Sequence, residues 1–485
     1  MENERGSWGS NIGFLLAAIG SAVGLGNIWG FPYKMGKSGG FTFLIAYLLL
    51  AVFVGFVVMV SELAMGRKVG KGVIGCYHTL SKKFKWVGWL AVFSPFIIMS
   101  FYSVLGGYCI EYMALNMSNL AFAGAEIKTG ADLFTAMLTN PFGCVVFTLL
   151  FLVICYLINR GGISGGIEKF NKIGMPALFV MLVIIIIRSV TLEGAVEGLK
   201  FMFVPGYAVS KGFIAEAPNF LTVLATAGGQ MFFSLSLAMG VMFTYGSYLN
   251  KQENLVRNSV VIVFSDTLVA LMAGLAVIPA AVAIGIQQGM NVADIKLSGP
   301  SLLFVTLQDV FNAMGTAGPL FGVIFYLLVL IAAISSAISL VEVVATFFLD
   351  RAAEKGKVGN RHKIVLIVCL AITVEAVLVA VDGLGSNGLW VPGQATFGIH
   401  TWNDCWLDFM DMMSEGIAMP LGALLMSLMV GYEIKSKTVL DEVRLGCNTK
   451  IDFFYNLCIK VITPIGMILV LLGQLNDFGF ISIFN

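Results

Sequence analysis

Several oxygen-bearing side chains interrupt otherwise apolar stretches of this 485-residue sequence. Asp266 lies in the middle of one stretch, Asn27 ends a glycine-rich segment in another, and Ser335 and Ser336 lie together in a third. An ionisable group costs about 2.5–3.5 kcal/mol at the centre of a membrane helix, and by default it marks a functional site. Hard cations bind carboxylate, hydroxyl and carbonyl oxygens, and no set of His and Cys residues indicates a transition metal. These residues predict an alkali-cation site, with Asp266 as a cation ligand or a proton carrier.

Two of the apolar stretches contain residues that disfavour a continuous helix. Residues 20–27 hold three glycines, a serine and an asparagine, and residues 228–240 hold small and hydroxyl residues near the middle of their stretch. Unpaired backbone groups are tolerated at membrane depth only where they are packed in protein or line a cavity. Paired interruptions in corresponding segments indicate a binding site in a protein built from inverted repeats. We therefore expect the polar residues to meet at these two breaks.

Each polar residue also has a purely structural interpretation. The amide of Asn27 could bond to a neighbouring helix, and serines in membrane helices often bond back to the preceding turn. Tyr102, Phe233 and Met239 would by default be packing or interfacial residues, and Asp266 could be a paired structural carboxylate. The glycine-rich break before Asn27 and the central position of Asp266 favour the functional interpretation for these two residues.

The composition predicts that these segments lie in a lipid bilayer. Hydrophobic residues make up 58% of the chain and charged residues 12%, whereas soluble proteins are about 25% charged. The net charge of +1 gives no case for a nucleic-acid partner. A membrane helix needs about 20 mostly apolar residues. Eleven segments meet this length, at approximately residues 10–36, 41–66, 88–117, 142–159, 167–190, 219–249, 255–287, 317–349, 363–382, 405–432 and 453–480. We expect an all-α membrane protein with 11 transmembrane helices.

The spans divide into two groups of five and one further span. Residues 1–190 hold spans one to five, residues 191–432 hold spans six to ten, and residues 433–485 hold span eleven. Because five is an odd number, the second group must have the opposite orientation, and the interrupted spans one and six then correspond. This topology predicts two inverted five-helix repeats. The long loops 190–218 and 288–316 could carry short helices that cover an entrance.

The distribution of basic residues predicts the orientation of the chain. Alternate loops hold 21 of the 29 Lys and Arg residues, and the opposite loops hold seven. Cytoplasmic loops carry an excess of Lys and Arg. We expect a multi-pass protein of the cell membrane with a cytoplasmic N-terminus and an extracellular C-terminus. The eight cysteines are scattered without a CxxC pair, which favours buried thiols over disulfides or a metal site.

Taken together, the motifs resemble those of the neurotransmitter:sodium symporter family, in its bacterial amino-acid-transporting branch, which includes the bacterial leucine transporter. The similarity runs from Arg5 to span eleven and is carried by Trp8 and residues 20–33, 62–67, 161–168, 230–236, 278–281 and 332–336. The resemblance implies the leucine-transporter fold, with spans one and six unwound at mid-membrane. It also implies sodium-coupled import of amino acids by alternating access, and no enzymatic activity.

The resemblance implies two sodium sites. The first would use the carbonyl of Ala22, the side chains of Asn27, Ser234 and Asp266, and the substrate carboxylate. The second would use the carbonyls of Gly20, Val23 and Ala332 and the hydroxyls of Ser335 and Ser336.

The resemblance also implies a substrate site between the two breaks. The substrate carboxylate would meet the amides of Leu25 and Gly26 at a helix N-terminus, where the dipole favours an anion, and the hydroxyl of Tyr102. The ammonium group would meet the carbonyls of Ala22, Phe233 and Ser234, with Ser236 nearby. The substrate side chain would lie among Ile98, Met239, Ser336 and Leu340, which favours a hydrophobic or aromatic amino acid, and Ser21 leaves room for a polar one.

Three positions refine what the family pattern implies. Monoamine carriers have aspartate where this chain has Gly24, so Gly24 favours a substrate with its own carboxylate. Asp266 replaces a common asparagine and would supply a fixed negative charge in place of chloride, or would exchange a proton. Gly30 replaces an arginine that often pairs with the acidic residue at the position of Asp411, so the outer gate must be built differently.

The inner gate implied by the family would pair Arg5 with Asp350, with Trp8, Tyr248 and Glu342 nearby. Two alternatives to an importer remain: a substrate-gated ion channel, and an amino acid sensor of the same fold that binds without transport.

Overall fold

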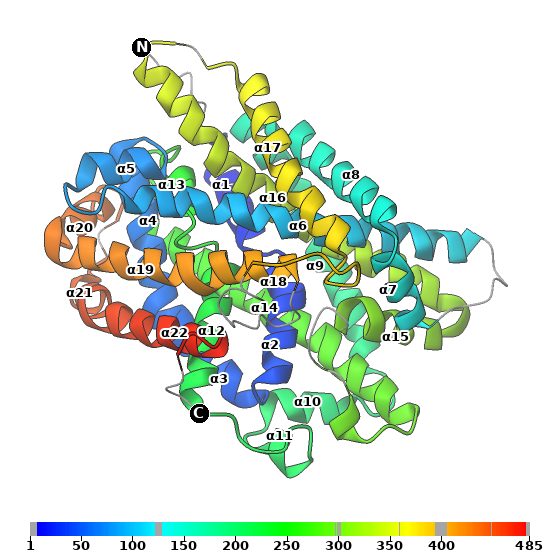
Figure 1. The fold of residues 1–485 in the computed structure, drawn as a ribbon. Helices are drawn as coiled ribbons and strands as arrows, with labels where there is room; N and C mark the ends of the chain where they lie inside the picture. Colours follow the sequence, from blue (N-terminus) through cyan, green and yellow to red (C-terminus); the bar gives the residue numbers. More distant parts are fainter. Residues whose placement is uncertain are drawn as a thin grey trace.

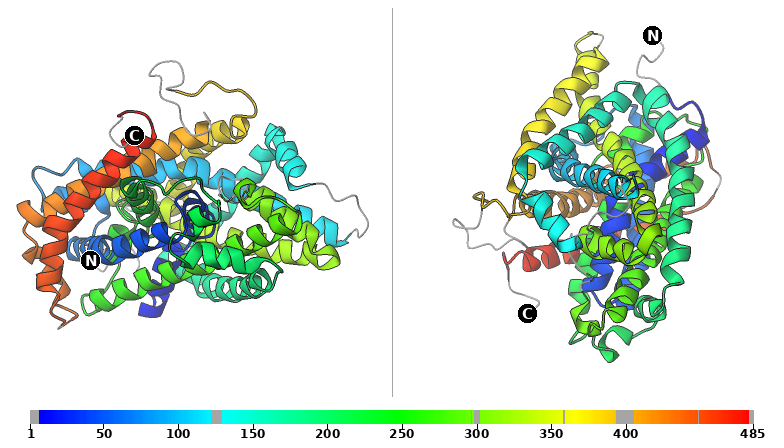
Figure 2. Two further views of the ribbon diagram at one scale, coloured as in Figure 1. Left: turned by 90° about the horizontal axis from the view of Figure 1, so that it is seen from below. Right: turned by 90° about the vertical axis from the view of Figure 1, so that its right-hand side faces the viewer.

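The computed structural model describes residues 7–121, 129–295, 297, 302–357, 359–392, 405–447 and 449–481. This part of the chain is helical and contains no strand. Long helices cross one another through the molecule, and short helices lie at both ends (Figures 1 and 2). The predicted all-α membrane-type architecture is confirmed.

The described part of the first half of the chain begins with a helix in two pieces and continues with four longer helical rods. The elements are α1 (Asn11–Ala22), η1 (Gly26–Gly30), α2 (Phe31–Lys37), α3 (Phe41–Leu50), η2 (Ala51–Gly55), α4 (Phe56–Val69), α5 (Val73–Leu80), α6 (Val87–Ala121), α7 (Gly130–Leu138), α8 (Pro141–Asn159), η3 (Ile163–Glu168) and α9 (Lys169–Val190). Here η1, η2 and η3 are π-helical turns.

The second half contains another helix in two pieces. The elements are α10 (Ala195–Phe203), α11 (Tyr207–Ser210), α12 (Phe220–Ser234), α13 (Val241–Gly246), α14 (Leu255–Gln287), η4 (Val292–Asp294), η5 (Leu302–Thr306), α15 (Leu307–Ala313), η6 (Gly315–Ala317), α16 (Gly318–Glu354), α17 (Arg361–Asp382), α18 (Trp406–Asp411), η7 (Met412–Ala418), α19 (Met419–Leu428), η8 (Met429–Glu433), α20 (Lys437–Val443), α21 (Asp452–Leu457), η9 (Cys458–Ile462) and α22 (Thr463–Asp477). Short helices therefore occupy both of the long predicted loops.

Nine helices in the described part of the chain are long and apolar enough to cross a membrane, or ten if the bent pair α1 and η1–α2 counts as one span. The sixth of the eleven expected spans is divided between α12 and α13, and neither piece alone reaches the length of a span. The count of about ten apolar helices therefore agrees with the sequence prediction apart from this divided segment.

The helix that begins at Asn11 ends at Ala22, within the glycine-rich segment. Val23 is extended, and the chain resumes a helical path at Gly26 with a bend of 45°. The second interruption follows Ser234, where Ser236, Ala238 and Gly240 have positive φ values of 52°, 60° and 79°. Such a conformation is uncommon for residues with a Cβ atom. Both interruptions fall where small residues are concentrated in the sequence.

Helices α4 and α13 pack backbone against backbone. A Cβ atom on Gly66 would lie 2.1 Å from the carbonyl oxygen of Phe243, and one on Gly246 would lie 2.6 Å from that of Leu63. Only glycine fits at such close approaches. Glu62 on α4 also accepts the amide of Ala238 at 2.7 Å, so the second break is held by the same helix.

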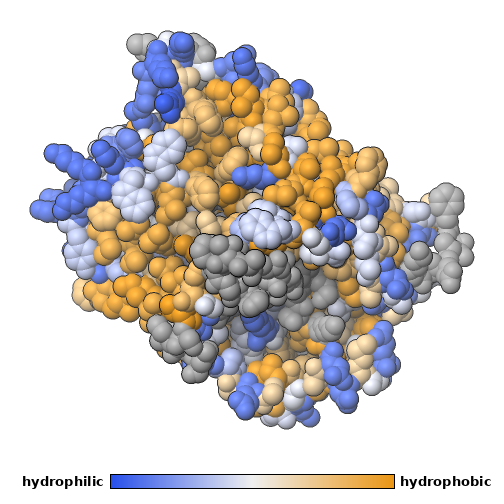
Figure 3. Space-filling view, in the orientation of Figure 1, coloured by the Kyte–Doolittle hydropathy of each residue, from blue (hydrophilic) through white to orange (hydrophobic). Residues whose placement is uncertain are grey.

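The molecular surface carries a wide apolar region. Large hydrophobic side chains are exposed on the outer helices, for example Phe142 on α8, Ile173 on α9, Val374 on α17 and Phe453 on α21. Figure 3 shows apolar surface between two hydrophilic ends of the molecule. Helices α5 and α20, in loops predicted to be cytoplasmic, lie at the opposite end from α10 and α11, in a loop predicted to be external (Figure 1). All eight cysteines are buried, in agreement with the interpretation of these residues as buried thiols.

Candidate functional site: two oxygen clusters beside a small cavity

The carboxylate of Asp266 lies at the meeting point of the two helix breaks. Asn27 Nδ2 donates to Asp266 Oδ1 at 2.7 Å, and the hydroxyl of Ser234 lies 2.9 and 3.0 Å from the two carboxylate oxygens. Asn27 and Asp266 are fully buried, and Ser234 is almost so. The structure thus brings together three residues that are up to 239 positions apart in the sequence.

A fourth member of this cluster, Tyr47 on α3, was missed by sequence reasoning. Its hydroxyl donates to Asp266 Oδ2 at 3.1 Å, and the side chain is fully buried. Tyr47 lies in a continuous apolar run, and its only sequence signal is a phenolic hydroxyl among aliphatic residues. With Asn27, Ser234 and Tyr47 around it, the carboxylate has donors on both oxygens.

The cluster suits a hard cation better than a transition metal. Its side-chain ligands are carboxylate, amide and hydroxyl oxygens, and the oxygen of Asn27 also accepts the amide of Gly24 at 3.0 Å. In the described ranges, no group of three His, Cys, Asp or Glu side chains could hold a metal ion. In membrane proteins, alkali cations commonly bind to oxygen atoms beside a broken helix.

A second oxygen cluster joins α16 to the end of α1. The hydroxyl of Ser335 lies 2.8 Å from the carbonyl oxygen of Ala332 and 3.5 Å from that of Val23. The hydroxyl of Ser336 lies 3.3 Å from the carbonyl oxygen of Gly20 and 2.8 Å from that of Ser21. All five residues of the second predicted sodium site are therefore neighbours. The carbonyls of Gly20 and Val23 lie at the end of α1, where following residues leave the helical path.

A small cavity lies between the two clusters. It is lined by Ser21, Ala22, Gly24, Gly26, Ile98, Tyr102, Phe233, Ser236, Met239, Ser336 and Leu340. Ten of these eleven are predicted substrate-binding residues; Gly24 is the addition, and the two predicted residues outside the lining, Leu25 and Ser234, adjoin it in sequence. The cavity volume of about 10 Å³ holds roughly one water molecule. A larger ligand enters only if the surrounding side chains move.

Polar groups from both breaks face this cavity. The amide of Leu25 donates to the hydroxyl of Tyr102 at 3.0 Å. Ser236 donates to the carbonyl oxygen of Ser21 at 2.9 Å, and the hydroxyls of these two serines are 3.2 Å apart. The apolar part of the lining comes from Ile98, Met239 and Leu340. The lining of the cavity therefore combines polar groups with apolar side chains.

Gly24 leaves no room for a side chain. A Cβ atom at this position would lie 2.3 Å from Ser336 Oγ and 2.5 Å from the hydroxyl of Tyr102. Any other residue would displace the groups that surround the cavity.

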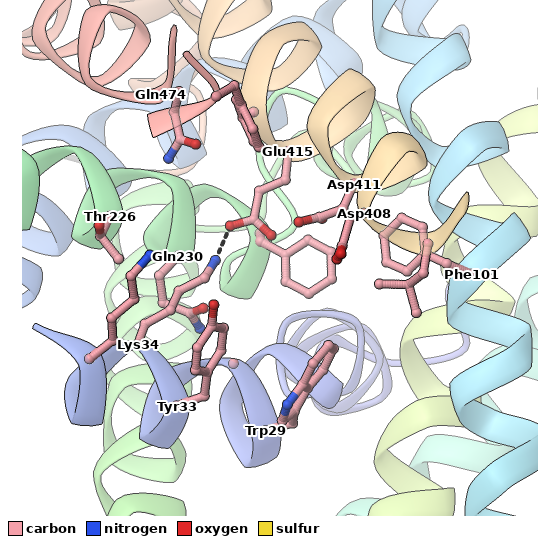
Figure 4. A pocket seen from close by; sticks show the side chains of 16 residues that line it. Trp29, Tyr33, Lys34, Phe101, Thr226, Gln230, Asp408, Asp411, Glu415 and Gln474 are labelled. Atoms are coloured by element: carbon pink, nitrogen blue, oxygen red, sulfur yellow. Dashed lines mark hydrogen bonds and ion pairs between the residues drawn. The ribbon is translucent and has the colours of Figure 1, made fainter. Parts of the chain in front are cut away.

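Phe233 separates the small cavity from a larger one of about 170 Å³. Its ring centroid lies 6.4 Å from that of Tyr102. The larger cavity is lined by polar residues of α2, α12, α18 and η7, including Lys34, Gln230, Asp408, Asp411 and Glu415 (Figure 4).

The predicted inner gate is described in part, because Arg5 lies outside the described residues. Asp350 accepts the amide of Gly72 at 2.8 Å. Trp8 donates its ring N–H to the carbonyl oxygen of Tyr245 at 3.1 Å, and Tyr248 donates to Glu342 Oε1 at 3.2 Å.

Sequence reasoning missed Arg361, which the structure pairs with Glu342. Arg361 contacts both carboxylate oxygens of the fully buried Glu342 and donates from Nε to the carbonyl oxygen of Asn159 at 3.0 Å. Arg361 is the first residue of α17. In the sequence it was one of several basic residues in a loop predicted to be cytoplasmic. Arg361 links the end of α8 and the start of α17 to the interior of α16.

Comparisons with known proteins agree over nearly the whole chain. The model of the sodium:neurotransmitter symporter family matches residues 5–131 and 137–482. The uncharacterized sodium-dependent transporter YhdH of Bacillus subtilis (strain 168) is 33% identical over 483 residues, which cover 99% of this chain and 100% of that protein. An uncharacterized sodium-dependent transporter of Haemophilus influenzae is 31% identical, over 97% of this chain and 98% of that protein. The crystal structure of MhsT in complex with L-phenylalanine matches with a TM-score of 0.81 and 33% identity, over 97% of this chain and 100% of that one.

Proposed function

Because the chain belongs to the sodium:neurotransmitter symporter family, we propose that this sodium-dependent symporter imports amino acids into the cell by alternating access. The observation that carries the proposal is the small cavity between two oxygen clusters, whose lining combines polar groups with apolar side chains. A zwitterion with an apolar side chain matches such a lining. The apolar surface of the outer helices suits a lipid bilayer.

We assign two sodium ions to the two clusters. The first would be held by the carbonyl of Ala22 and the oxygens of Asn27, Ser234 and Asp266, together with the substrate carboxylate. The second would be held by the carbonyls of Gly20, Val23 and Ala332 and the hydroxyls of Ser335 and Ser336. A carboxylate shared between substrate and sodium couples the two affinities by the same factor in each direction.

The substrate carboxylate would bind at the amides of Leu25 and Gly26 and at Tyr102. The ammonium would bind the carbonyls of Ala22, Phe233 and Ser234, beside Ser236. An acidic side chain at position 24 could take the place of the substrate carboxylate, but no side chain fits there. Gly24 therefore supports this orientation of a substrate that has its own carboxylate. The apolar part of the lining, from Ile98, Met239 and Leu340, favours a hydrophobic or aromatic amino acid. MhsT, whose crystal structure contains L-phenylalanine, supports the same class.

Transport is proposed to be independent of chloride. The carboxylate of Asp266 lies among the side-chain donors of Asn27, Ser234 and Tyr47, where an anion would otherwise be needed beside the first sodium ion. A fixed negative charge at this point makes a second anion unnecessary.

The proposed topology is that of the leucine transporter, with 11 spans in two inverted repeats and the breaks of spans one and six near mid-membrane. The separation of α5 and α20 from α10 and α11 supports a cytoplasmic N-terminus and an extracellular C-terminus in the cell membrane. On the inner side, Arg5 would pair with Asp350, and Trp8, Tyr248 and Glu342 would complete the closed gate.

The decisive experiment is uptake of radiolabelled amino acids into proteoliposomes under an inward sodium gradient, with twenty unlabelled amino acids as competitors. Accumulation of a hydrophobic or aromatic amino acid that requires sodium is expected. Ion current without accumulation would indicate a substrate-gated channel. Sodium-dependent binding without uptake or counterflow would indicate a sensor.

A further inference from the structure

The cavity outside Phe233 contains an ion pair that bridges two parts of the chain 381 residues apart. Lys34 on α2 donates to Glu415 on η7, and Figure 4 shows the two side chains directed toward each other at the cavity. Lys34 lies two turns beyond the first break, whereas Phe233 and the small cavity lie beside the break. The pair is therefore displaced from both, toward the C-terminal end of α2. The pair joins α2 to η7 across a cavity that Phe233 also lines.

The pair is partly shielded from solvent. The side chains of Lys34 and Glu415 are only 16% and 8% exposed. Fully exposed ion pairs contribute little because water and salt screen them. An ion pair at this degree of burial is screened less, and removal of one partner leaves the other charge poorly solvated. Loss of one partner is therefore expected to disturb the contact between α2 and η7.

The position of the pair follows from the residues one turn closer to Phe233. Gly30 precedes Lys34 by four residues, and Asp411 precedes Glu415 by four residues. A Cβ atom on Gly30 would lie 2.7 Å from Gln230 Oε1, a buried atom with no hydrogen-bond partner among the described residues. Gln230 is held in this position by its bond to the carbonyl oxygen of Gly26 at 2.7 Å. The first cation available on this face of α2 is therefore Lys34, and its partner is one turn beyond Asp411.

We propose that the Lys34–Glu415 ion pair is the outer closure of the substrate pathway and must break for the amino acid to reach the site below Phe233. Asp411 contacts Glu415 and faces Lys34, so it is positioned to receive the lysine when the pair opens. The proposal rests on the proposed function for the identity of the ligand that passes. The position of the pair does not depend on that identity.

The test measures access to the cavity directly. Thr226 lines the same cavity and is 9% exposed, and Thr226→Cys supplies one thiol there. The eight native cysteines are all buried, so their background reactivity is low. A membrane-impermeant methanethiosulfonate reagent is added to proteoliposomes in sodium and L-phenylalanine, and the labelling rate is measured. Lys34→Met and Glu415→Gln should each raise this rate about tenfold, since each removes one half of a partly buried pair.

Two further variants distinguish a labelling increase caused by loss of the ion pair from one caused by general damage to the structure. The reversed pair, Lys34→Glu with Glu415→Lys, should return the labelling rate to near that of the Thr226→Cys parent. Lys37→Met is the matched control, because Lys37 carries the same charge at the rim of the same cavity and is exposed. It should leave the rate unchanged. Equal rates in the parent, Lys34→Met and Glu415→Gln would overturn the proposal, and so would an increase that Lys37→Met reproduces.

The labelling rate does not require transport, which keeps this proposal distinct from the proposed function. Faster labelling in both single variants with no amino acid uptake by the parent would support the closure and reject the importer. Sodium-coupled uptake by the parent with unchanged labelling in the variants would support the importer and reject the closure.

Discussion

Asn27 and Asp266 connect the bend in the first helix to the middle of α14 through two hydrogen bonds. The amide nitrogen of Asn27 lies 2.7 Å from Asp266 Oδ1 and 3.1 Å from the backbone oxygen of Asp266. The side chain of one asparagine thus donates hydrogen bonds to both a carboxylate oxygen and a backbone oxygen of α14. The proposed first sodium ion would bind where this contact fixes the oxygens.

Replacement of Asp266 by asparagine should make transport depend on chloride. The variant keeps the shape of the side chain but loses the negative charge beside Ser234 and Tyr47, so the first sodium ion would then need an anion from solution nearby. Sodium-driven uptake should persist in chloride and fall at least about tenfold when gluconate replaces it, equivalent to about 1.4 kcal/mol. Asp309→Asn, a carboxylate change on α15, is the control. Chloride-independent uptake by Asp266→Asn at the parental rate would contradict the proposal.

An alanine at Gly24 should abolish most amino acid binding. Its Cβ atom would contact Ser336 Oγ and the Tyr102 hydroxyl far inside normal distances. Over-packing of this kind typically costs about 1–3 kcal/mol, and the displaced groups are those proposed to bind substrate. Equilibrium binding of labelled L-phenylalanine should weaken by about tenfold or more. Gly165→Ala, at a glycine with open space around it, should bind normally.

Tyr102→Phe should weaken substrate binding without loss of the fold. The variant removes the hydroxyl that is proposed to donate a hydrogen bond to the substrate carboxylate, and a hydrogen bond to a charged group contributes about 1.5–3 kcal/mol. Isothermal titration in saturating sodium should show a reduced affinity for the amino acid. Tyr432→Phe removes a hydroxyl from an exposed tyrosine and serves as the comparison. Identical affinities in the two variants would argue against a substrate contact at Tyr102.

Arg361→Met should destabilise the protein far more than loss of an exposed arginine. Glu342 is fully buried, and removal of its partner leaves an uncompensated charge, a loss of about 3–5 kcal/mol. Arg444, which forms an exposed pair with Asp441, should contribute at most about 1 kcal/mol. Thermal unfolding in detergent should rank Arg361→Met well below Arg444→Met. Addition of Glu342→Leu to Arg361→Met should recover part of the stability, because no buried charge then remains.

Sodium should stabilise the protein, and potassium should not. A ligand that binds only the folded state at 100 times its dissociation constant adds about 2.7 kcal/mol per site. The unfolding temperature should therefore rise with sodium concentration at constant ionic strength. Asp266→Ala should reduce this rise, and Ser335→Ala should reduce it through the second cluster. A sodium response that survives loss of both side chains would place the ions elsewhere.

The sequence was sufficient to predict the polar residues at the breaks, because each had an unusual local context. Asp266 stood out as a charge in an apolar run, and Asn27 stood out because it follows three glycines in seven residues. The same logic predicted an interruption within residues 20–27, and α1 ends within this segment, at Ala22.

The missed partners had no such local signal. Tyr47 meets Asp266 across 219 residues, and Lys34 meets Glu415 across 381. Each resembles an ordinary residue of its own segment, a tyrosine in an apolar span or a lysine in a loop. Contacts of this kind depend on how distant helices pack, and neither spacing nor periodicity within one segment contains that information.

The close contact between α4 and α13 limits how the inner half of the sixth span can move. Two surfaces that meet backbone to backbone at Gly66 and Gly246 have no intervening side chains to repack, so sliding would break the fit at both points. Arg67 adds a further tie, since it donates to the carbonyl oxygen of Glu253 just after α13 at 2.7 Å. We therefore expect the two helices to move as one rigid unit, so that a displacement near Ala238 is transmitted along α13 toward the end of the molecule that is predicted to be cytoplasmic.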